Sequence, residues 1–355
     1  MSTYLLIDIG AGTMDVLFGD DESGHQYKAV VASPVIEVAK QIAATPGNLV
    51  LTGGEMGGGA LSRVLKERAS TASVVISESA AATLNHNMDK VVSWGLQVVS
   101  DAEAQEFADD NSYTHLVLAD LDLPRLKRIV AVFGVPFLFD IFAVCAQDHG
   151  IPPSGISHLD YRHNRFVDIL DKSPHPHMLV YDHKNVPLEM NRLRSILEQA
   201  LQVPADGVYV MDSGMAAILG ATTDENAQHI EPLVVLDVAT SHTVGAVMIG
   251  AEIAGFFEYH THDITLERLE ALIRDLANGD LSHEQILSEG GHGCYLRKSV
   301  GYENLQAIIA TGPKRDLVRA SCLPIVWGAP MGDNMMTGNA GLLAAIKLKK
   351  GLTCC

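Results

Sequence analysis

The residues best placed to do chemistry lie near the start of the chain, in the run Leu-Leu-Ile-Asp-Ile-Gly-Ala-Gly-Thr-Met-Asp-Val-Leu at positions 5–17. Two short apolar segments flank a turn of small residues, and the turn region carries two carboxylates, Asp8 and Asp15. Backbone N–H groups of such a turn can close around phosphate oxygens, while a carboxylate at its root can orient water around a magnesium ion. The pattern predicts a phosphate site. A tight β-hairpin with glycines at positive φ would explain the same residues without a ligand.

The pattern returns in the second half of the chain. Residues 233–249 again read as strand, small polar turn and strand, with Asp237 near the end of the first strand. This similarity indicates an internal repeat. A third apolar strand, at 305–310, ends in a glycine-containing turn that carries Lys314 and Arg315. Such a turn could hold a nucleoside.

Two segments rich in small residues are expected to be helices. Residues 213–221 and 338–345 both repeat glycine and alanine at helical spacing, which lets another helix approach closely. The two helices are therefore expected to cross each other between two domains. Elsewhere strands alternate with helices, which favours sheets with parallel strands that are covered by helices.

Two further segments are candidate binding loops. The glycine-rich segment 52–59 precedes an expected helix, where it could bind an anion or simply allow close packing. Residues 150–177 are rich in Pro, His and Arg and are expected to form a long polar insertion. This insertion could recognise an acidic substrate, or it could be a solvated loop held by ion pairs.

The order of these motifs resembles the actin, Hsp70 and sugar-kinase superfamily of ATPases. The resemblance covers nearly the whole chain: two phosphate motifs, an adenosine motif and two connecting helices occur in the expected order. Within that superfamily the chain resembles a prokaryotic family labelled pyruvate formate-lyase activating protein. The label conflicts with the cysteine pattern, because glycyl-radical activating enzymes need a Cys-x-x-x-Cys-x-x-Cys site and no three cysteines here have that spacing.

The resemblance implies an α/β fold of two RNase H-like domains, each a mixed five-stranded sheet with helices, around a central cleft that binds Mg-ATP. The expected division is 1–222 for the first domain with an insertion near 150–177, 223–335 for the second, and 336–355 for a C-terminal helix that returns to the first domain and a tail. The expected cofactors are ATP and magnesium (Mg2+).

The resemblance also assigns roles to individual positions. Asp8 and Asp237 would be catalytic carboxylates that orient the metal, and His242 is a third catalytic candidate. The expected nucleotide-binding residues come from all three motifs: Gly10, Gly12, Thr13, Asp15, Thr240, Ser241, Gly312, Lys314 and Arg315.

The second phosphate motif departs from the superfamily pattern. Ala239, Thr240 and Ser241 stand in place of a glycine-rich turn, and His242 stands where threonine is usual. A Cβ at a position that needs positive φ costs about 1 kcal/mol or more, so this turn is expected to differ in shape. His242 could contact phosphate or act as a base, or it could be a buried, hydrogen-bonded histidine. Thr311 likewise replaces a glycine of the adenosine motif. Nucleotide binding is therefore favoured over fast hydrolysis.

Composition sets limits on the partners. The chain has 355 residues, of which 47% are hydrophobic, so it can bury a large core. The net charge of −18 argues against nucleic acid or an anionic membrane as the main partner. We find no secretory signal and no apolar run long enough to cross a bilayer, and we expect a cytoplasmic protein.

Histidines and cysteines give weaker signals. His260 and His262 alternate on an expected strand and could share a metal ion, although two ligands are too few to define a zinc site. Cys145 lies in an apolar run and is expected in the core. The adjacent cysteines 354 and 355 are expected to lie in a frayed tail.

Three functions fit these observations. The first is a slow ATPase that activates or remodels a partner protein. The second is a small-molecule kinase of the sugar-kinase type, in which Asp237 or His242 takes a proton from an acidic substrate's hydroxyl. The third is a nucleotide-binding structural protein without turnover. An iron–sulfur dehydratase activator of the same superfamily ranks last, because the cysteines do not show its pattern.

Overall fold

A computed structural model describes residues 3–153 and 155–352. The first half of the chain builds a six-stranded sheet in the order β3-β2-β1-β8-β10-β9. Three antiparallel strands form a meander, after which β8 and β10 run parallel to β1 and the short β9 closes the edge. Their bounds are β1 (Thr3–Ile9), β2 (Thr13–Asp20), β3 (Gln26–Ala32), β8 (Phe139–Ala146), β9 (Val180–Asp182) and β10 (Ala205–Asp212).

The second half repeats this topology. Its sheet has the order β14-β13-β12-β11-β15-β16, again an antiparallel meander followed by two strands parallel to the first. The internal repeat and the two-domain α/β architecture are thus confirmed. Each sheet has six strands instead of the expected five, because β9 and β14 add one edge strand each. The bounds are β11 (Leu233–Val238), β12 (His242–Ile249), β13 (Glu252–His260), β14 (Gly293–Leu296), β15 (Ile308–Thr311) and β16 (Ile325–Trp327).

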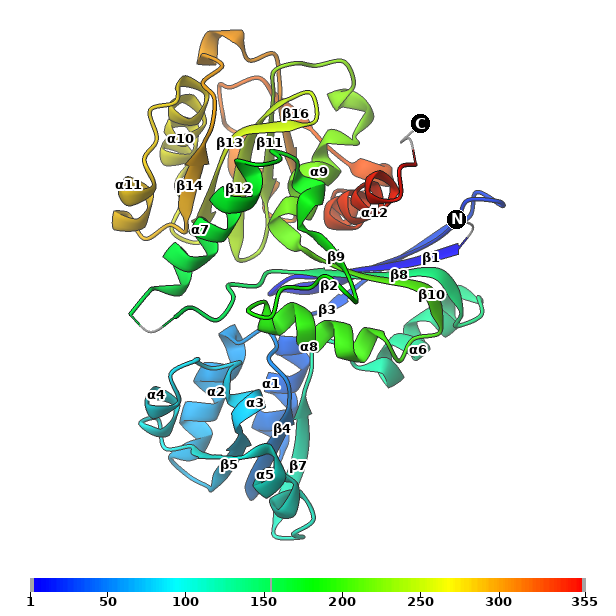
Figure 1. The fold of residues 1–355 in the computed structure, drawn as a ribbon, viewed down its shortest axis with the longest axis vertical. Coiled ribbons are helices and arrows are strands. Elements are labelled where there is room, and N and C mark those ends of the chain that lie inside the picture. Colours follow the sequence, from blue (N-terminus) through cyan, green and yellow to red (C-terminus); the bar gives the residue numbers. More distant parts are fainter. Residues whose placement is uncertain (1–2, 154, 353–355) are drawn as a thin grey trace.

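Two helices lie between these sheets, as expected from their small residues (Figure 1). They are α9 (Ser213–Thr222) and α12 (Thr337–Lys349), and both are buried along most of their length. One continuous core joins them to facing side chains of both sheets, for example Leu6 of β1 and Val235 of β11. The helices therefore connect the two halves mechanically.

A separate four-stranded parallel sheet occupies the chain between β3 and β8, in the order β6-β5-β4-β7. It lies at the opposite end of the molecule from the second sheet and has its own apolar core (Figure 1). The sequence analysis did not recognise this unit. Its strands and helices are α1 (Pro34–Ala44), β4 (Asn48–Gly53), α2 (Gly59–Ala69), β5 (Val74–Ser77), α3 (Glu78–Ala81), α4 (Met88–Val92), β6 (Gln97–Val99), α5 (Asp101–Ala108) and β7 (Tyr113–Leu118).

The segment 150–177 was expected to be a polar loop, and this expectation was wrong for residues 158–170. Residues 158–170 form helix α7 (His158–Leu170). Ser157 caps its N-terminus, because the Ser157 hydroxyl accepts a hydrogen bond from the N–H of Asp160. Arg162 and Phe166 of this helix are buried, so one face packs inward. In the sequence, the many polar residues of this segment hid the helical spacing of its apolar residues.

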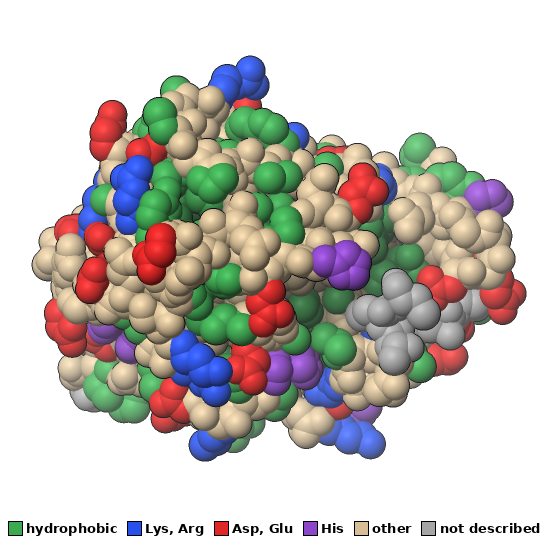
Figure 2. Space-filling model, turned by 90° about the horizontal axis from the view of Figure 1, so that it is seen from above, with side chains coloured by type: hydrophobic (Ala, Val, Ile, Leu, Met, Phe, Trp, Pro, Cys, Tyr) green, Lys and Arg blue, Asp and Glu red, His purple; other side chains and the backbone are tan. Residues whose placement is uncertain are grey.

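The remaining helices cover the outer faces of the large sheets. Within the described residues, no helix combines the length and apolar character that a membrane crossing requires. On the face shown in Figure 2, basic side chains are scattered among acidic ones. The helices on the outer faces are α6 (Leu123–Phe133), α8 (Asn191–Ala200), α10 (Leu266–Asn278) and α11 (His283–Ser288). Short 3-10 turns lie at Pro176–Leu179, Glu225–Ala227, Tyr302–Asn304, Arg315–Val318, Pro330–Gly332 and Asn334–Met336.

Candidate functional site

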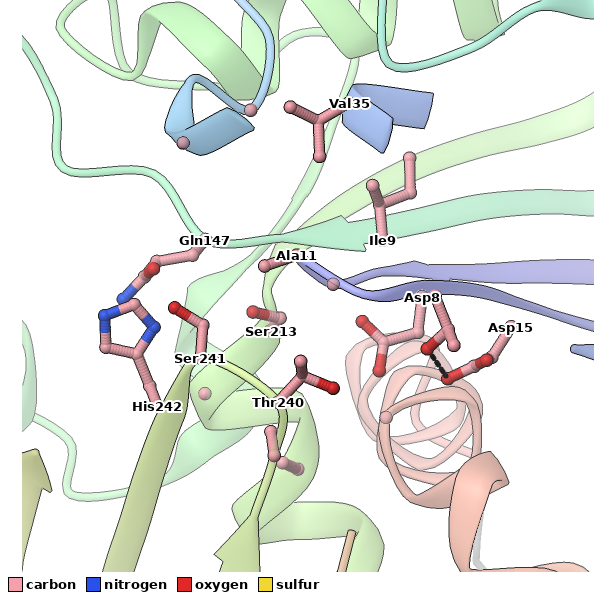
Figure 3. Close-up of a pocket in the computed structure, with 18 of the residues that line it drawn as sticks. Asp8, Ile9, Ala11, Asp15, Val35, Gln147, Ser213, Thr240, Ser241 and His242 are labelled. Carbon is pink, nitrogen blue, oxygen red and sulfur yellow. Dashed lines mark hydrogen bonds between the residues drawn. The ribbon is translucent and has the colours of Figure 1, made fainter. Parts of the chain in front are cut away.

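A cavity of about 410 Å³ lies where the two strand-turn-strand motifs face each other. This volume is within the range of small-molecule and cofactor sites. Figure 3 shows Asp8 and Asp15 on one wall and Thr240, Ser241 and His242 on the loop opposite. The structure therefore brings the first two sequence motifs into one site.

The first motif forms a closed turn between β1 and β2. The N–H of Gly10 donates to the carbonyl of Thr13 at 3.0 Å, and the register places Asp8 directly opposite Asp15. The hydroxyl of Thr13 lies 3.4 Å from Asp15 Oδ2, while Asp15 Oδ1 is buried without a hydrogen-bond partner. Two carboxylates thus stand together at the base of the turn, and one has an unused oxygen.

The second motif has the same closure despite its missing glycines. The N–H of Ala239 donates to the carbonyl of His242 at 3.1 Å, which matches the Gly10 to Thr13 bond. The expectation of a differently shaped turn was wrong, because neither Gly10 nor Gly12 has a positive φ. A side chain at these positions therefore carries no backbone strain.

Gly12 has a different function, which is close approach between the two halves. A Cβ at this position would lie 2.9 Å from the hydroxyl oxygen of Thr240. The first turn can therefore contact the second only because Gly12 has no side chain.

Asp237 is the structural counterpart of Asp8. Asp8 is paired with Cys145 of the neighbouring parallel strand, and Asp237 is paired with Thr311 in the same way. The Thr311 hydroxyl donates to Asp237 Oδ1 at 2.9 Å. The repeat is incomplete, because the residue opposite Asp237 on β12 is Val244, whereas Asp15 stands opposite Asp8.

Burial raises the pKa of Asp8, Asp15 and Asp237, three of the carboxyl groups that line this cavity. Desolvation raises the pKa of Asp8 to about 7, and the charge of Asp237 adds to the effect. Desolvation and the nearby Asp8 raise the pKa of Asp15 to about 8. For Asp237 desolvation raises the pKa to about 6, although the hydrogen bond from Thr311 opposes it. Each group is thus costly to ionise without a compensating cation.

These residues fit a magnesium ion. Their donors are carboxylate oxygens, which hard divalent cations prefer, and the unpartnered oxygen of Asp15 is available as an acceptor. Helix α12 also leaves space for Asp8, because a Cβ on Gly338 would lie 2.0 Å from Asp8 Oδ2. Asp8 and Asp237 would hold the ion, with Asp15 beside Asp8.

The third motif contributes one of its three predicted residues to the cavity wall. Gly312 lines the cavity with φ of 87°, and a Cβ there would lie 2.8 Å from Asp237 Oδ1. Lys314 is exposed, and the guanidinium of Arg315 binds the carbonyl of Gly328 and lies over the ring of Trp327. Neither cation lines the cavity.

Several lining residues were missed by sequence reasoning, because they come from elements without a recognisable motif. Arg192 of α8 lines the cavity and is held by two hydrogen bonds to Asp120. Gln147 and His149 follow β8. Of the glycine-rich segment 52–59, Gly57 to Gly59 line the cavity, and Gly58 also packs closely, since a Cβ there would lie 2.1 Å from the carbonyl oxygen of Thr83.

His242 is half-buried at the far end of the cavity, where its ring lies beside the amide of Gln147 in Figure 3. Its Nε2 atom is buried and has no hydrogen-bond partner. Desolvation lowers the pKa of His242 to about 4, so the ring is neutral at pH 7. The Nε2 atom is therefore available to bind another group.

An ion-pair network adjoins this histidine. The guanidinium of Arg162 bonds to Asp212 at 3.0 Å and also to Glu258. All three side chains are buried, and they join α7, the end of β10 and β13. The network therefore links the segment 150–177 to both large sheets.

Comparisons with solved structures include several distant matches. One is a putative N-acetylmannosamine kinase from Listeria monocytogenes, with 11% identity over 98% of this chain and 99% of the other and a TM-score of 0.34. A diol dehydratase-reactivating factor has 12% identity over 98% and 100% of the two chains and a TM-score of 0.31. The PPX-GPPA enzyme of Aquifex aeolicus has 10% identity over 99% and 94% and a TM-score of 0.27. Similarity at this level does not establish a shared fold.

A search of curated proteins gives no match. A family model, however, matches residues 56–317, which is most of the chain. Its description is "Putative pyruvate format-lyase activating enzyme (DUF1786)". The matched region includes the turn at 239–242, the part of the four-stranded-sheet unit from α2 onwards and the network around Arg162. The chain belongs to this family.

Proposed function

We propose that the protein binds Mg-ATP in the cavity between its two large sheets and hydrolyses it slowly. The observation that carries this proposal is the convergence of Asp8 and Asp237, which occupy equivalent positions in two copies of one topology. A triphosphate would be repelled by carboxylates alone, so the acidic walls support a nucleotide that arrives with a divalent cation.

The chain supplies two kinds of contact to such a ligand. The turns at 10–13 and 239–242 offer backbone N–H groups at small residues, where phosphate oxygens can approach closely. Asp8 and Asp237 would hold the magnesium ion, which when bound neutralises phosphate charge and positions water. Gly312, without a side chain, allows Asp237 and the carbonyl of Val238 to pack against this turn at the cavity wall.

Hydrolysis is expected to be slow because the described lining residues offer a single arginine and no lysine to stabilise the transferred phosphoryl group. Arg192 is the cavity's one arginine among the described residues, and both its charge and its hydrogen-bonding fork are occupied by Asp120. Phosphoryl transfer depends on electrostatic stabilisation of the transferred group, so a site with a committed arginine is a weak catalyst.

We further propose that nucleotide binding changes the angle between the two sheets and so acts on a partner protein. The support is mechanical: α9 and α12 cross between the sheets through small residues, and a cross-domain ligand would draw Asp8 and Asp237 together. Hinge and shear motions of this kind need a close, smooth contact. The radical-enzyme activity in the family description is not proposed, because Cys145 and Cys294 are buried in different sheets and Cys322 is exposed elsewhere. Cysteines 354 and 355 lie outside the described residues.

A direct test compares nucleotide affinity by calorimetry in the wild type, Asp8→Asn, Asp237→Asn and the exposed control Asp316→Asn. Both cavity variants should lose Mg-ATP affinity by at least about tenfold, as expected when a ligand to a charged group is removed, and the control should bind as the wild type does. Unchanged affinity in both cavity variants would contradict the assignment of the site.

The kinase alternative is distinguished by product analysis. Wild-type protein with Mg-ATP is incubated with a panel of hydroxylated acids and sugars. Phosphate release without a phosphorylated product supports an ATPase. Stoichiometric formation of ADP and a phosphorylated product would instead identify a kinase. Binding without either product would identify a nucleotide-binding protein without turnover.

A further inference from the structure

Three histidines from separate segments converge at the end of the second sheet. His242 begins β12, His260 ends β13 directly opposite it, and His292 precedes β14. One ring nitrogen of each lies within 4.8 Å of the other two. Their rings also lie close, with centroids 4.4 Å apart for His242 and His292 and 4.5 Å apart for His260 and His292.

The separation of two of these nitrogens matches a shared metal ion. Nε2 of His260 lies 3.2 Å from Nε2 of His292. Two nitrogens on one tetrahedral zinc ion, each about 2.0–2.1 Å from it, are separated by roughly 3.3 Å. The same distance allows a hydrogen bond between the two rings when no ion is present, and the nitrogen of His242 lies within 4.8 Å of both.

The cluster is poorly satisfied by the protein alone. Nε2 of His242 is buried without a hydrogen-bond partner. A buried polar atom without a partner costs free energy, and neutral imidazole nitrogen is a good ligand for zinc and similar ions. A metal ion would remove this cost.

A carboxylate stands behind one ligand, as in many metal sites. Glu258 Oε1 lies 3.3 Å from Nδ1 of His292, close enough for an ion pair although the two atoms are not aligned for a hydrogen bond, and Glu258 is held in turn by Arg162 and Gln147. A carboxylate on the second nitrogen orients a metal-binding histidine and raises its basicity. Arg162 with Glu258 and Asp212 carries a formal charge of −1, which favours a nearby cation.

We propose that His242, His260 and His292 bind one divalent transition-metal ion of the zinc type. The donors are nitrogens, so this site is chemically separate from the carboxylate oxygens of Asp8, Asp15 and Asp237, which suit magnesium. Because His242 and Glu258 line the cavity, the ion lies in the cavity wall, where a fourth ligand can come from water or from a bound anion. Three protein ligands and one exchangeable position are typical of catalytic zinc sites.

The structure adds two residues to the pair suggested by sequence. His262 is 75% exposed and lies 3.2 Å from Asp263, and its ring centroid is 5.4 Å from that of His260, but it is not one of the three converging histidines. Within the cluster His260 meets His242 and His292, which are 18 and 32 positions away in the chain.

The test uses the full-length protein, freed of metal with a chelator and titrated with Zn2+ against a chromogenic competitor. We expect one high-affinity zinc ion per chain in the wild type and a loss of more than about 100-fold in affinity for His260→Gln and His292→Gln, since removal of even an outer partner costs about 10–100-fold. His262→Gln is the matched control, because it removes a neighbouring exposed histidine and should bind zinc as the wild type does. Circular dichroism establishes that each variant is folded.

A second measurement does not depend on variants. X-ray absorption at the zinc edge of the wild type should give three imidazole nitrogens, and cobalt(II) substitution should give the visible bands of a four-coordinate ion. The proposal is overturned by absence of stoichiometric zinc, by oxygen-only coordination, by wild-type affinity in both cluster variants, or by loss of zinc in His262→Gln. None of these outcomes depends on whether the protein binds ATP.

Discussion

Gly220 of α9 and Gly341 of α12 face each other at the crossing of the two central helices. A Cβ on Gly220 would lie 1.8 Å from the carbonyl oxygen of Thr337, and a Cβ on Gly341 would lie 1.8 Å from that of Ala216. The helix backbones are therefore in direct contact. This contact determines how closely the two large sheets approach each other, because both helices pack against both sheets through one core.

The close contact at this crossing predicts that one added methyl group destabilises the protein. Gly220→Ala and Gly341→Ala should each reduce the free energy of unfolding by at least about 2 kcal/mol, since neighbouring backbone cannot yield as a side chain can. Urea denaturation gives the values. Gly59→Ala is the control, because nothing lies within 4 Å of a Cβ there and alanine is the better helix former. Equal stability of Gly59→Ala and Gly341→Ala would refute close contact at the crossing.

The contact between the two turns predicts a compensating pair of substitutions. Gly12→Ala places a methyl group against Thr240 and should weaken Mg-ATP binding by holding the turns apart. Thr240→Ala alone should change affinity less, and the double variant Gly12→Ala with Thr240→Ala should recover part of the loss. Calorimetric titration of the four proteins gives the coupling energy. If the changes in binding free energy of the two single variants simply add in the double variant, the turns do not touch when nucleotide is bound.

The raised pKa values of Asp8 and Asp15 predict a dependence of stability on pH. A carboxyl whose pKa is higher in the folded than in the unfolded state binds protons more tightly when folded, so stability falls as pH rises through the folded value. Between pH 7 and 8.5, the free energy of unfolding of the metal-free protein should fall by up to about 1.4 kcal/mol per pH unit for each proton that is released on unfolding. Histidines with lowered pKa do not titrate in this window.

The matching variant is Asp15→Asn, which keeps the shape of the side chain and removes its charge. In thermal or urea unfolding with a chelator present, its stability should depend less on pH between 7 and 8.5 than that of the wild type. Parallel pH profiles for the two proteins would mean that Asp15 is ionised throughout and that its burial does not raise the pKa.

The buried ion pairs of Arg162 predict a large structural effect. Arg162→Met leaves Asp212 and Glu258 buried without their cation, and loss of one partner of a buried pair costs about 3–5 kcal/mol. Urea denaturation should show this loss. Arg319→Met removes an exposed pair with Asp316 and should leave the stability nearly unchanged, because solvent screens such a pair. A small loss for Arg162→Met would mean that water reaches both carboxylates.

Local features of the sequence were enough for part of the fold. Alternating apolar segments and the repeated Asp-containing turns predicted two similar sheets, and small residues at helical spacing predicted α9 and α12. The four-stranded sheet was not recognised as a separate unit, because its strands have the same apolar pattern as those of the large sheets. Nothing in a strand's own sequence says which other strand it pairs with.

The polar helix α7 shows a second limit. Six of its 13 residues are charged or histidine. Its buried face includes Arg162, which is neutralised by carboxylates from two other segments. A buried arginine is indistinguishable from a solvated one until those partners are placed.

The sequence by itself determined the chemistry available to this protein: small-residue turns with Asp8, Asp15 and Asp237, a Gly312 turn, and helices able to pack closely. These depend on side-chain size and charge, which are local properties. The tertiary structure alone decided which groups meet. It places Asp237 opposite Asp8, directs Lys314 and Arg315 away from the cavity, and assembles His242, His260 and His292 in one cluster while His262 is exposed. Such meetings depend on strand order and register, which arise from packing of the whole chain.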